Sequence, residues 1–398
     1  MKNKKMYAMA LCLVVFLQMG GVGLSPVLAD MNKAFPQCPA AMIQMVSSLP
    51  SMFVAVTNLF IPLLCRYLSK KYMMAAGSGM AVAFAFLGFF FHESLAGLYV
   101  WSGILGIGTS MACTVAQAAV NEMFTPKERV DVYGKMAFTA SIGTMMMTFA
   151  GGFLVRRGWH YGYLVYLLAV SGLLASLIVL PVNTALHQEV KSVEKKRESC
   201  DRGKLLFACA SAFFVGYLYN VAAANIGMLV TELKFGDSGT AGFISTVMLL
   251  MGGIAGLCVN RISRRIGYQT ITLGYLSIFV GFYLVFCSKT LHSLYLAAVI
   301  CGGAISFVMP FAQVIAADAD ASGATAGIAR TVLFSSVGML FSPVMTPVAS
   351  IIMGTELVRY RFLLASLIGL AYMIFAFLFL KFYGKGRQEE NFVGQRQI

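Results

Sequence analysis

The sequence predicts an all-α membrane protein with twelve transmembrane helices arranged as two related six-helix bundles. Three observations carry this prediction: the composition, the spacing of the charged residues and an internal repeat. Of the 398 residues, 59% are hydrophobic and only 12% are charged. A soluble domain of this length needs a far more charged surface. The composition therefore excludes the soluble fold classes.

Twelve stretches of at least 19 residues contain no Asp, Glu, Lys or Arg. Each is long enough to cross a bilayer as a helix, which takes about 20 mostly apolar residues because the backbone finds no hydrogen-bond partners in lipid. The stretches, some of which include a loop, are 6–29, 34–65, 72–92, 94–121, 136–155, 158–188, 205–231, 238–260, 266–288, 290–317, 331–355 and 362–380.

The first stretch follows Lys2, Lys4 and Lys5, as the apolar core of a secretory signal peptide would. Such a core has about 7–15 residues, and this stretch is longer. We therefore interpret it as the first transmembrane helix.

The cations predict the orientation of the chain. With the N-terminus inside and twelve crossings, 23 of the 30 Lys and Arg residues fall on the side of the two termini. This asymmetry is the positive-inside rule. It predicts a multi-pass membrane protein with both termini cytoplasmic. The absence of N-x-[ST] sequons and the short loops favour a bacterial plasma (inner) membrane. The net charge of +14 then faces membrane lipid and indicates no nucleic-acid partner.

A polar segment and a repeat divide the chain into halves. The most polar internal segment, 183–204, predicts a cytoplasmic linker between bundles at 1–182 and 205–382, with a cytoplasmic tail at 383–398. Stretches 94–121 and 290–317 match at an offset of 196 residues, which aligns Ser110 with Ser306 and Gln117 with Gln313. The basic loops after the second and eighth stretches also match, at an offset of 194. Parallel repeats of this kind are typical of carriers.

The second of these basic loops, Gly256 to Gly267 (GLCVNRISRRIG), resembles the signature G-x-x-x-D-R-x-x-R-R-x-G of the major facilitator superfamily. Asn260 stands at the Asp position, and Arg66 stands there in the first copy. The resemblance implies a transporter that works by alternating access, whose basic loops clamp the cytoplasmic helix ends. The implied gating residues are Arg66, Lys70, Lys71, Asn260, Arg261, Arg264 and Arg265. As an alternative, these residues are only positive-inside anchors.

A second family motif is altered. Antiporters of this family carry G-x-x-x-G-P-x-x-G-G on the fifth helix, and the matching run here has Met147 and Thr148 in place of the central Gly-Pro. The alteration weakens the interpretation as an antiporter.

In that family, helices 1, 4, 7 and 10 line the central cavity, and polar residues occur in all four of these stretches here. Polar side chains within a span are costly in lipid, so they should face a cavity or another helix. The candidate solute-binding residues are Gln18, Ser110, Gln117, Tyr217, Asn220, Asn225, Ser306 and Gln313. For the two serines, close helix packing is the favoured alternative. Gln117 and Gln313 lie nearer the cytoplasmic ends, where they are equally compatible with a gate.

Charge is missing from the middle of the predicted spans. All sixteen acidic residues lie at span ends or in loops, and none of the four histidines lies near a span centre. We therefore expect a neutral or apolar solute. If a proton is the coupling ion, Asp30 at the outer end of the first span is the candidate carrier. Its alternative role is a loop residue paired with Lys33, and sodium is the alternative coupling ion.

The expected function is secondary transport of a small organic solute by a monomer. Efflux is the favoured direction because flexible Met-rich surfaces accept varied ligands and the chain has 25 Met. The alternatives are an uptake permease and an uncoupled facilitator. We expect no enzyme activity, since no intramembrane catalytic motif occurs. No cofactor or metal is expected, because the nine cysteines lack metal-ligand spacing. A channel or sensor would need a selectivity ring or an output domain, and neither is evident.

Overall fold

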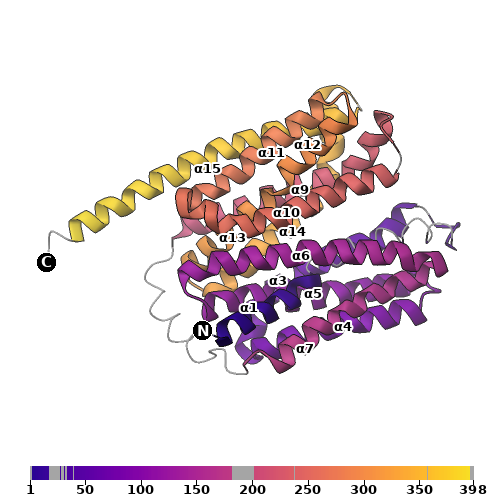
Figure 1. Ribbon diagram of the computed structural model, residues 1–398, viewed down its shortest axis with the longest axis horizontal. Helices are drawn as coiled ribbons and strands as arrows, with labels where there is room; N and C mark the ends of the chain where they lie inside the picture. Colours follow the sequence, from indigo (N-terminus) through magenta and orange to yellow (C-terminus); the bar gives the residue numbers. More distant parts are fainter. Residues whose placement is uncertain are drawn as a thin grey trace.

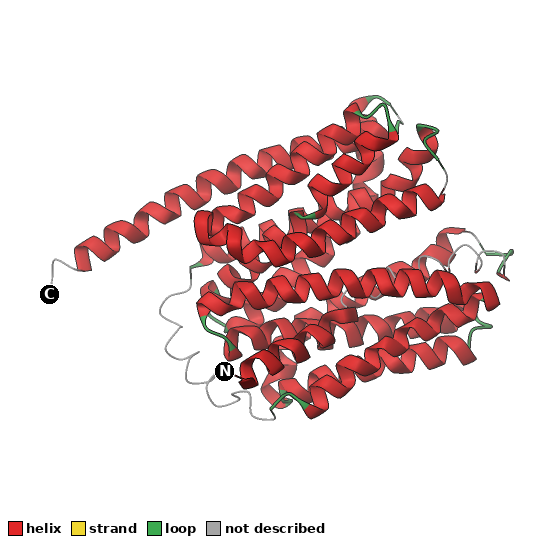
Figure 2. Ribbon diagram, in the orientation of Figure 1, coloured by secondary structure: helices red, strands yellow, loops and turns green. Residues whose placement is uncertain are grey.

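The computed structural model describes residues 2–17, 27, 31, 34–38, 40–181, 201–236, 238–355 and 357–394. Within these residues the regular elements are helices, and none is a strand (Figure 2). The prediction of an all-α protein is confirmed.

The helical elements follow the predicted stretches. The first half contains α1 (Lys2–Val14) with η1 (Val15–Leu17), α3 (Ala40–Tyr67), α4 (Lys70–Phe90), α5 (Leu95–Met123), α6 (Pro126–Leu154) with η3 (Val155–Arg157), and η4 (Trp159–Leu168) with α7 (Ala169–Ile178). The second contains α9 (Arg202–Glu232), α10 (Ser238–Ile266) with η5 (Gly267–Gln269), α11 (Thr270–Cys287), α12 (Leu291–Gly302) with α13 (Ala304–Ala319), α14 (Ala324–Met353) and α15 (Val358–Gly394).

Each predicted stretch thus contains one helix or a run of helical pieces. In the described part of the chain, nine segments are long and apolar enough to cross a membrane, and one of them combines α10 with α11. The helix α15 continues through most of the segment predicted as a tail. Most of the predicted linker lies outside the described residues.

Local sequence explains two helix ends. At the start of α6, the Glu128 carboxylate accepts hydrogen bonds from the Thr125 backbone N–H and hydroxyl, both at 2.9 Å. This capping box, with Pro126 as the first helical residue, satisfies donors that a helix start leaves free. The signature glycine Gly267 has a φ of 57° after α10. Only glycine adopts that conformation readily, so it allows the chain to turn tightly into α11.

The helices form two bundles that lie side by side (Figure 1). In the first, α5 packs against α3 and α4, and α4 packs against α7; in the second, α9 packs against α14 and α13, and α11 against α15. The bundles meet where α6 packs against α10 and α3 packs against α14. The start of α1 and the end of α15 lie at the same end of the molecule, which we call the basic end.

Glycines let α6 and α10 approach closely near the basic end. A Cβ on Gly134 of α6 would lie 2.1 Å from the Gly256 carbonyl oxygen of α10, and a Cβ on Gly256 would lie 2.8 Å from the Gly134 oxygen. Close backbone contact of this kind is how small residues join membrane helices. The first glycine of the signature loop is therefore part of the contact between the bundles.

Candidate functional site

Two glutamines connect the bundles. Gln313 on α13 donates from Nε2 to Oε1 of Gln117 on α5, at 2.7 Å, and both side chains are buried. The two residues are 196 apart, as the repeat requires. Beside them, Ala118 packs with Ala317 and Ile328 of the other bundle in a small apolar cluster. The geometry is that of a closed contact between the bundles, which favours the gate interpretation of this pair over solute binding.

Lys70 links three helices at the basic end. It is the first residue of α4 and is only 4% exposed. Its ammonium group forms an ion pair with Glu122 on α5 and donates to the Thr325 hydroxyl of α14 at 3.0 Å. A buried cation needs both a counter-charge and hydrogen bonds. The contact with Thr325 makes the second bundle part of its environment.

Arg129, in the first turn of α6, makes a second set of contacts. Its Nε donates to the Phe124 carbonyl at 3.1 Å, and its Nη2 donates to the Asn121 carbonyl at 2.8 Å. These carbonyls belong to the last turn of α5, where a helix leaves oxygens without partners and favours positive charge. Nη1 also lies 3.8 Å from Oδ1 of Asp318 on α13, in the other bundle.

A third contact runs from α6 to α10. The Asn260 amide donates to the Asp131 carboxylate at 3.4 Å, and Asp131 also pairs with Lys135 at 2.6 Å. Asn260 is the residue that replaces the signature Asp. The Asn260 amide can donate to the Asp131 carboxylate, whereas an Asp at position 260 would repel that carboxylate. Asn at this position therefore suits its contact with Asp131.

The remaining predicted gating residues make no such contacts. Arg66, Arg261, Arg264 and Arg265 are exposed and Lys71 is partly exposed, and the described residues give none of these five an ion pair. Their positions agree with the alternative of positive-inside anchors. Of the seven predicted gating residues, the structure therefore brings Lys70 and Asn260 into contacts between the bundles.

The predicted gating residues omit six residues of these contacts: Glu122, Arg129, Asp131, Tyr133, Asp318 and Thr325. The Tyr133 hydroxyl accepts from the Asn121 amide at 3.2 Å and donates to the Gln117 carbonyl at 2.8 Å, which ties α6 to the end of α5. The 196-residue offset carried the missing signal. It relates Arg129, which contacts Asp318 of the second bundle, to Thr325, which Lys70 of the first bundle contacts.

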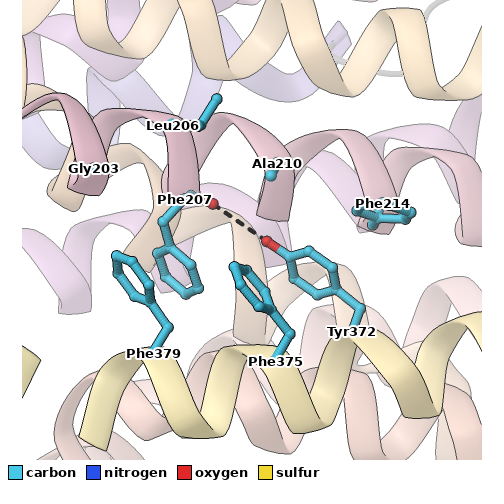
Figure 3. Close-up of a pocket in the computed structure, with 8 residues that line it drawn as sticks. All are labelled: Gly203, Leu206, Phe207, Ala210, Phe214, Tyr372, Phe375 and Phe379. Carbon is cyan, nitrogen blue, oxygen red and sulfur yellow. Dashed lines mark hydrogen bonds between the residues drawn. The ribbon is translucent and has the colours of Figure 1, made fainter. Parts of the chain in front are cut away.

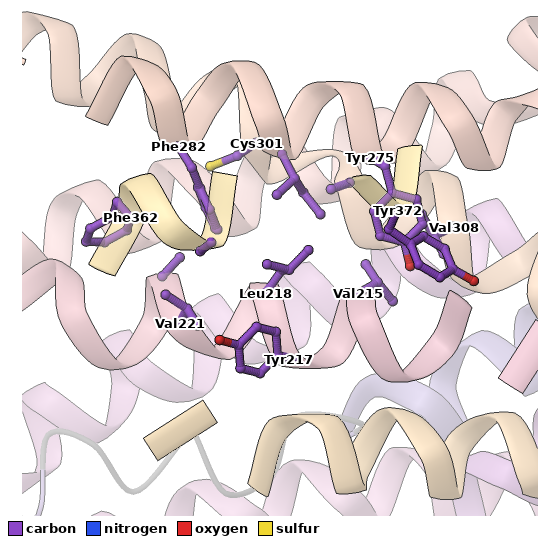
Figure 4. Packing of buried hydrophobic residues seen from close by; sticks show 14 of the residues in the cluster. Val215, Tyr217, Leu218, Val221, Tyr275, Phe282, Cys301, Val308, Phe362 and Tyr372 are labelled. Atoms are coloured by element: carbon purple, nitrogen blue, oxygen red, sulfur yellow. The ribbon is translucent and has the colours of Figure 1, made fainter. Parts of the chain in front are cut away.

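The candidate solute-binding residues of α9 have different surroundings. Tyr217 is buried and lies on the side of α9 away from Phe282 (Figure 4). The Asn220 amide donates to the Met339 carbonyl of α14 at 2.9 Å. Asn225 donates to the Val221 carbonyl at 2.9 Å and accepts from Arg361 of α15, also at 2.9 Å. Both groups of the Asn225 amide are thus engaged within the second bundle.

The two candidate serines are both buried. Ser306 donates to the Gly252 carbonyl of α10 at 2.8 Å, so its hydroxyl joins two helices of one bundle. The Ser110 hydroxyl is buried and has no hydrogen-bond partner in the described part of the chain. Gln18 and Asp30, the candidates on the first predicted span, lie outside the described residues.

The described residues contain no group of three or more His, Cys, Asp or Glu side chains able to hold a metal ion. The chemistry that this arrangement offers is a set of hydrogen bonds and ion pairs that close one end of an interface between two bundles. Such contacts can form and break without any covalent step.

Comparisons with known proteins address the fold. The family model described as Major Facilitator Superfamily matches residues 10–340. Similar solved structures include the proton:xylose symporter XylE bound to 6-bromo-6-deoxy-D-glucose, with 12% identity, a TM-score of 0.73, and 95% of this chain and 96% of that chain covered.

The transporter FucP in the outward conformation has 15% identity and a TM-score of 0.70, with 94% and 99% of the two chains covered. The human organic anion transporter MFSD10 (TETRAN) has 14% identity and a TM-score of 0.71, with 93% and 99% covered. No curated protein matches this chain in sequence. At these identities, the solved structures show a shared fold.

Proposed function

Because this chain belongs to the major facilitator superfamily, we propose that it carries a small neutral or apolar organic solute across the membrane. The family and its fold support secondary transport by alternating access, and they indicate a transporter and not an enzyme. The observation that carries the proposal is the closure at the basic end, where four polar contacts join the bundles: Gln117–Gln313, Lys70–Thr325, Arg129–Asp318 and Asn260–Asp131.

In this proposal the basic end is the cytoplasmic gate, and the structure has that gate closed. Each contact joins residues from the two bundles, so rocking one bundle against the other must break all four. The polar groups of the gate lie at the helix ends, away from the span centres. Solute would then bind deeper in the interface, where Tyr217 and Asn220 of α9 and Gln18 of the first span are our candidates.

The class of solute follows from charge. The span centres carry no acidic residue or histidine, and an ionic solute would need a counter-charge in a site of low dielectric constant. A neutral or apolar molecule needs none. Buried Tyr217 offers an aromatic face and a hydroxyl to such a molecule.

We propose efflux across a bacterial plasma membrane as the direction and place of action. The uneven distribution of the cations supports cytoplasmic termini. Inside-out and right-side-out vesicles would separate the two directions, because an exporter takes up solute only into inside-out vesicles when energised. Accumulation in right-side-out vesicles would instead identify an uptake permease.

The decisive experiment is uptake and counterflow in proteoliposomes across a panel of neutral, anionic and cationic organic compounds. We expect counterflow of neutral or apolar members only. Tyr217→Ala and Asn220→Ala, each made alone, should lower counterflow at least tenfold while the protein stays folded in the membrane. Transport of an anion or cation alone would overturn the proposed solute class, and unchanged counterflow in both variants would overturn the site.

A further inference from the structure

A groove of about 510 Å³ lies between α9 and α15, within the second bundle (Figure 3). Its small residues, Gly203 and Ala210, come from α9, and aromatic rings of both helices form its walls. Leu206 beside it is 70% exposed and Phe375 is 48% exposed. In a membrane protein, such exposed apolar side chains face lipid. The groove therefore opens to the bilayer and not to the interface between the bundles.

The lining of the groove is apolar because its one hydroxyl is turned inward. The Tyr372 hydroxyl lies 2.9 Å from the Ser211 hydroxyl and 3.3 Å from the Phe207 carbonyl oxygen, to which it donates. Between the two helices, the rings of Phe207 on α9 and Phe379 on α15 stack with centroids 4.3 Å apart. With the hydroxyl bonded inside the protein and the remaining lining made of rings and small residues, the groove presents an apolar surface.

The length of the groove matches one leaflet. From Gly203 to Phe214, α9 rises through eleven residues, or about 16 Å. Half of a hydrocarbon core is about 15 Å. The groove begins at the first turn of α9, at the basic end of the molecule. It thus follows the full depth of the leaflet on that side.

Cations lie at the mouth of the groove. Arg202 is exposed and precedes Leu206 and Ala210 by one and two helical turns, so it continues their row on α9. The described residues give Arg202 no ion pair. Lys204 pairs with Asp201 at 2.6 Å, so one cation there is matched by an acidic residue. The mouth keeps a net positive charge, which attracts anionic headgroups.

We propose that this groove is a binding site for an anionic phospholipid, with one acyl chain along the aromatic wall and the headgroup against Arg202. An acyl chain is narrow enough for a groove of this volume, whereas a helix of a second protein copy, about 10 Å across, is not. The site is separate from the proposed solute path, and the inference does not rest on the proposed function.

The test is native mass spectrometry of the full chain with phosphatidylglycerol or phosphatidylcholine of identical acyl chains. We expect retention of phosphatidylglycerol at low lipid excess. Ala210→Phe should abolish it by filling the groove, whereas Ala76→Phe, on the exposed face of α4, should leave it unchanged. Arg202→Gln should weaken phosphatidylglycerol retention roughly fivefold, the factor expected from one cation at an anionic surface, without changing phosphatidylcholine retention.

Arg264→Gln removes an exposed cation at the end of α10 and serves as the charge control for lipid retention. Since Arg202→Gln changes no packed side chain, it keeps the test valid if Ala210→Phe misfolds. The proposal is overturned if Arg202→Gln and Arg264→Gln act alike, or if Ala210→Phe leaves retention intact. It is also overturned if phosphatidylcholine is retained as well as phosphatidylglycerol. The same holds if the unmodified protein is a dimer that Ala210→Phe dissociates, because a second protein copy would then occupy the groove.

Discussion

Lys70 is a cation enclosed at the end of a helix, between an acidic residue of its own bundle and a hydroxyl of the other. Its 4% exposure removes it from water, so its charge is tolerated only because Glu122 and Thr325 replace that water. In such an arrangement, a single substitution leaves an uncompensated charge, while removing both charges does not. The residue is therefore coupled to stability as well as to the proposed gate.

Lys70→Met should lower the free energy of unfolding by about 3 kcal/mol, because it leaves the Glu122 carboxylate buried without its cation. Thermal unfolding in detergent measures this. Lys71→Met, at the next and partly exposed position, is the matched control and should cost far less. The double variant Lys70→Met/Glu122→Leu should recover most of the loss. Equal effects of the two single variants would contradict the buried-pair argument.

Glu128 joins the N-terminal helix to α6. The hydrogen bond from Lys4, with those from the Thr125 backbone and hydroxyl, lowers the pKa of Glu128 to about 2 from its ordinary 4.5. A carboxyl with a lowered pKa in the folded chain contributes stability above its unfolded pKa and loses it as pH falls through the folded pKa. The contribution of Glu128 is thus complete above about pH 5 and lost between pH 4.5 and 2.

Glu128→Gln should therefore lower the midpoint of thermal unfolding at pH 7 by a small amount, since the Lys4 pair is exposed and screened by salt. The difference from the unmodified protein should stay constant from pH 7 to 5 and shrink toward pH 3. Glu93→Gln, at an exposed position in the loop before α5, is the control. A difference that grows on acidification would have the wrong sign for a lowered pKa.

At the scale of elements, the contact between α6 and α10 depends on two glycines. Gly134→Ala places a Cβ 2.1 Å from the Gly256 carbonyl oxygen, so the two helices must separate at the basic end. We expect the closed gate to be disfavoured and counterflow to fall at least tenfold. Gly79→Ala on α4, where a Cβ meets nothing within 4 Å, is the control.

Spin labels at Tyr67 and Tyr268, exposed residues of the two bundles, would report the separation in a cysteine-free background. A longer distance in Gly134→Ala than in Gly79→Ala is expected. An unchanged distance would show that α6 and α10 do not set the closure.

The contact between α5 and α13 depends on one hydrogen bond. Gln117→Leu leaves the buried Gln313 amide without its partner, at a cost of about 1–3 kcal/mol to the closed state. This cost should raise the ratio of open to closed gate about tenfold, as measured by the distance between spin labels at Tyr67 and Tyr268. Gln117→Leu/Gln313→Leu removes both buried amides and should restore closure. If the double variant opens the gate further than Gln117→Leu alone, the effect on closure does not come from the hydrogen bond between the two amides.

At the scale of the whole molecule, the sequence predicted the architecture because lipid imposes strong rules on a chain. Uncharged stretches located the helices, and the loop 256–267 indicated the family. The repeat also paired Gln117 with Gln313, which the structure finds in hydrogen-bond contact. Two bundles related by the repeat place equivalent residues opposite each other across their interface, so this contact follows from symmetry.

The partners of the charged residues were not predictable in the same way. Lys70 and Arg66 look alike in the sequence, yet one is buried and the other is exposed. The difference arises from which helix ends meet when the bundles pack, and hydropathy carries no information on that. Likewise, nothing in the sequence near Asn225 indicates Arg361, which lies 136 residues away along the chain. Those contacts require the tertiary arrangement.

The driving force is a property of the whole transport cycle. Since the sequence places no acidic residue near a span centre, a coupling proton would have to be carried at a span end, and Asp30 is our candidate. In proteoliposomes, we expect an imposed pH gradient to drive accumulation of the solute by the unmodified protein. Asp30→Asn should abolish that accumulation but keep counterflow, because solute exchange needs no proton movement. Glu93→Gln is the matched control and should keep both. Accumulation that persists in Asp30→Asn would show that Asp30 does not carry the coupling proton. No accumulation by either the unmodified protein or Asp30→Asn would identify a facilitator.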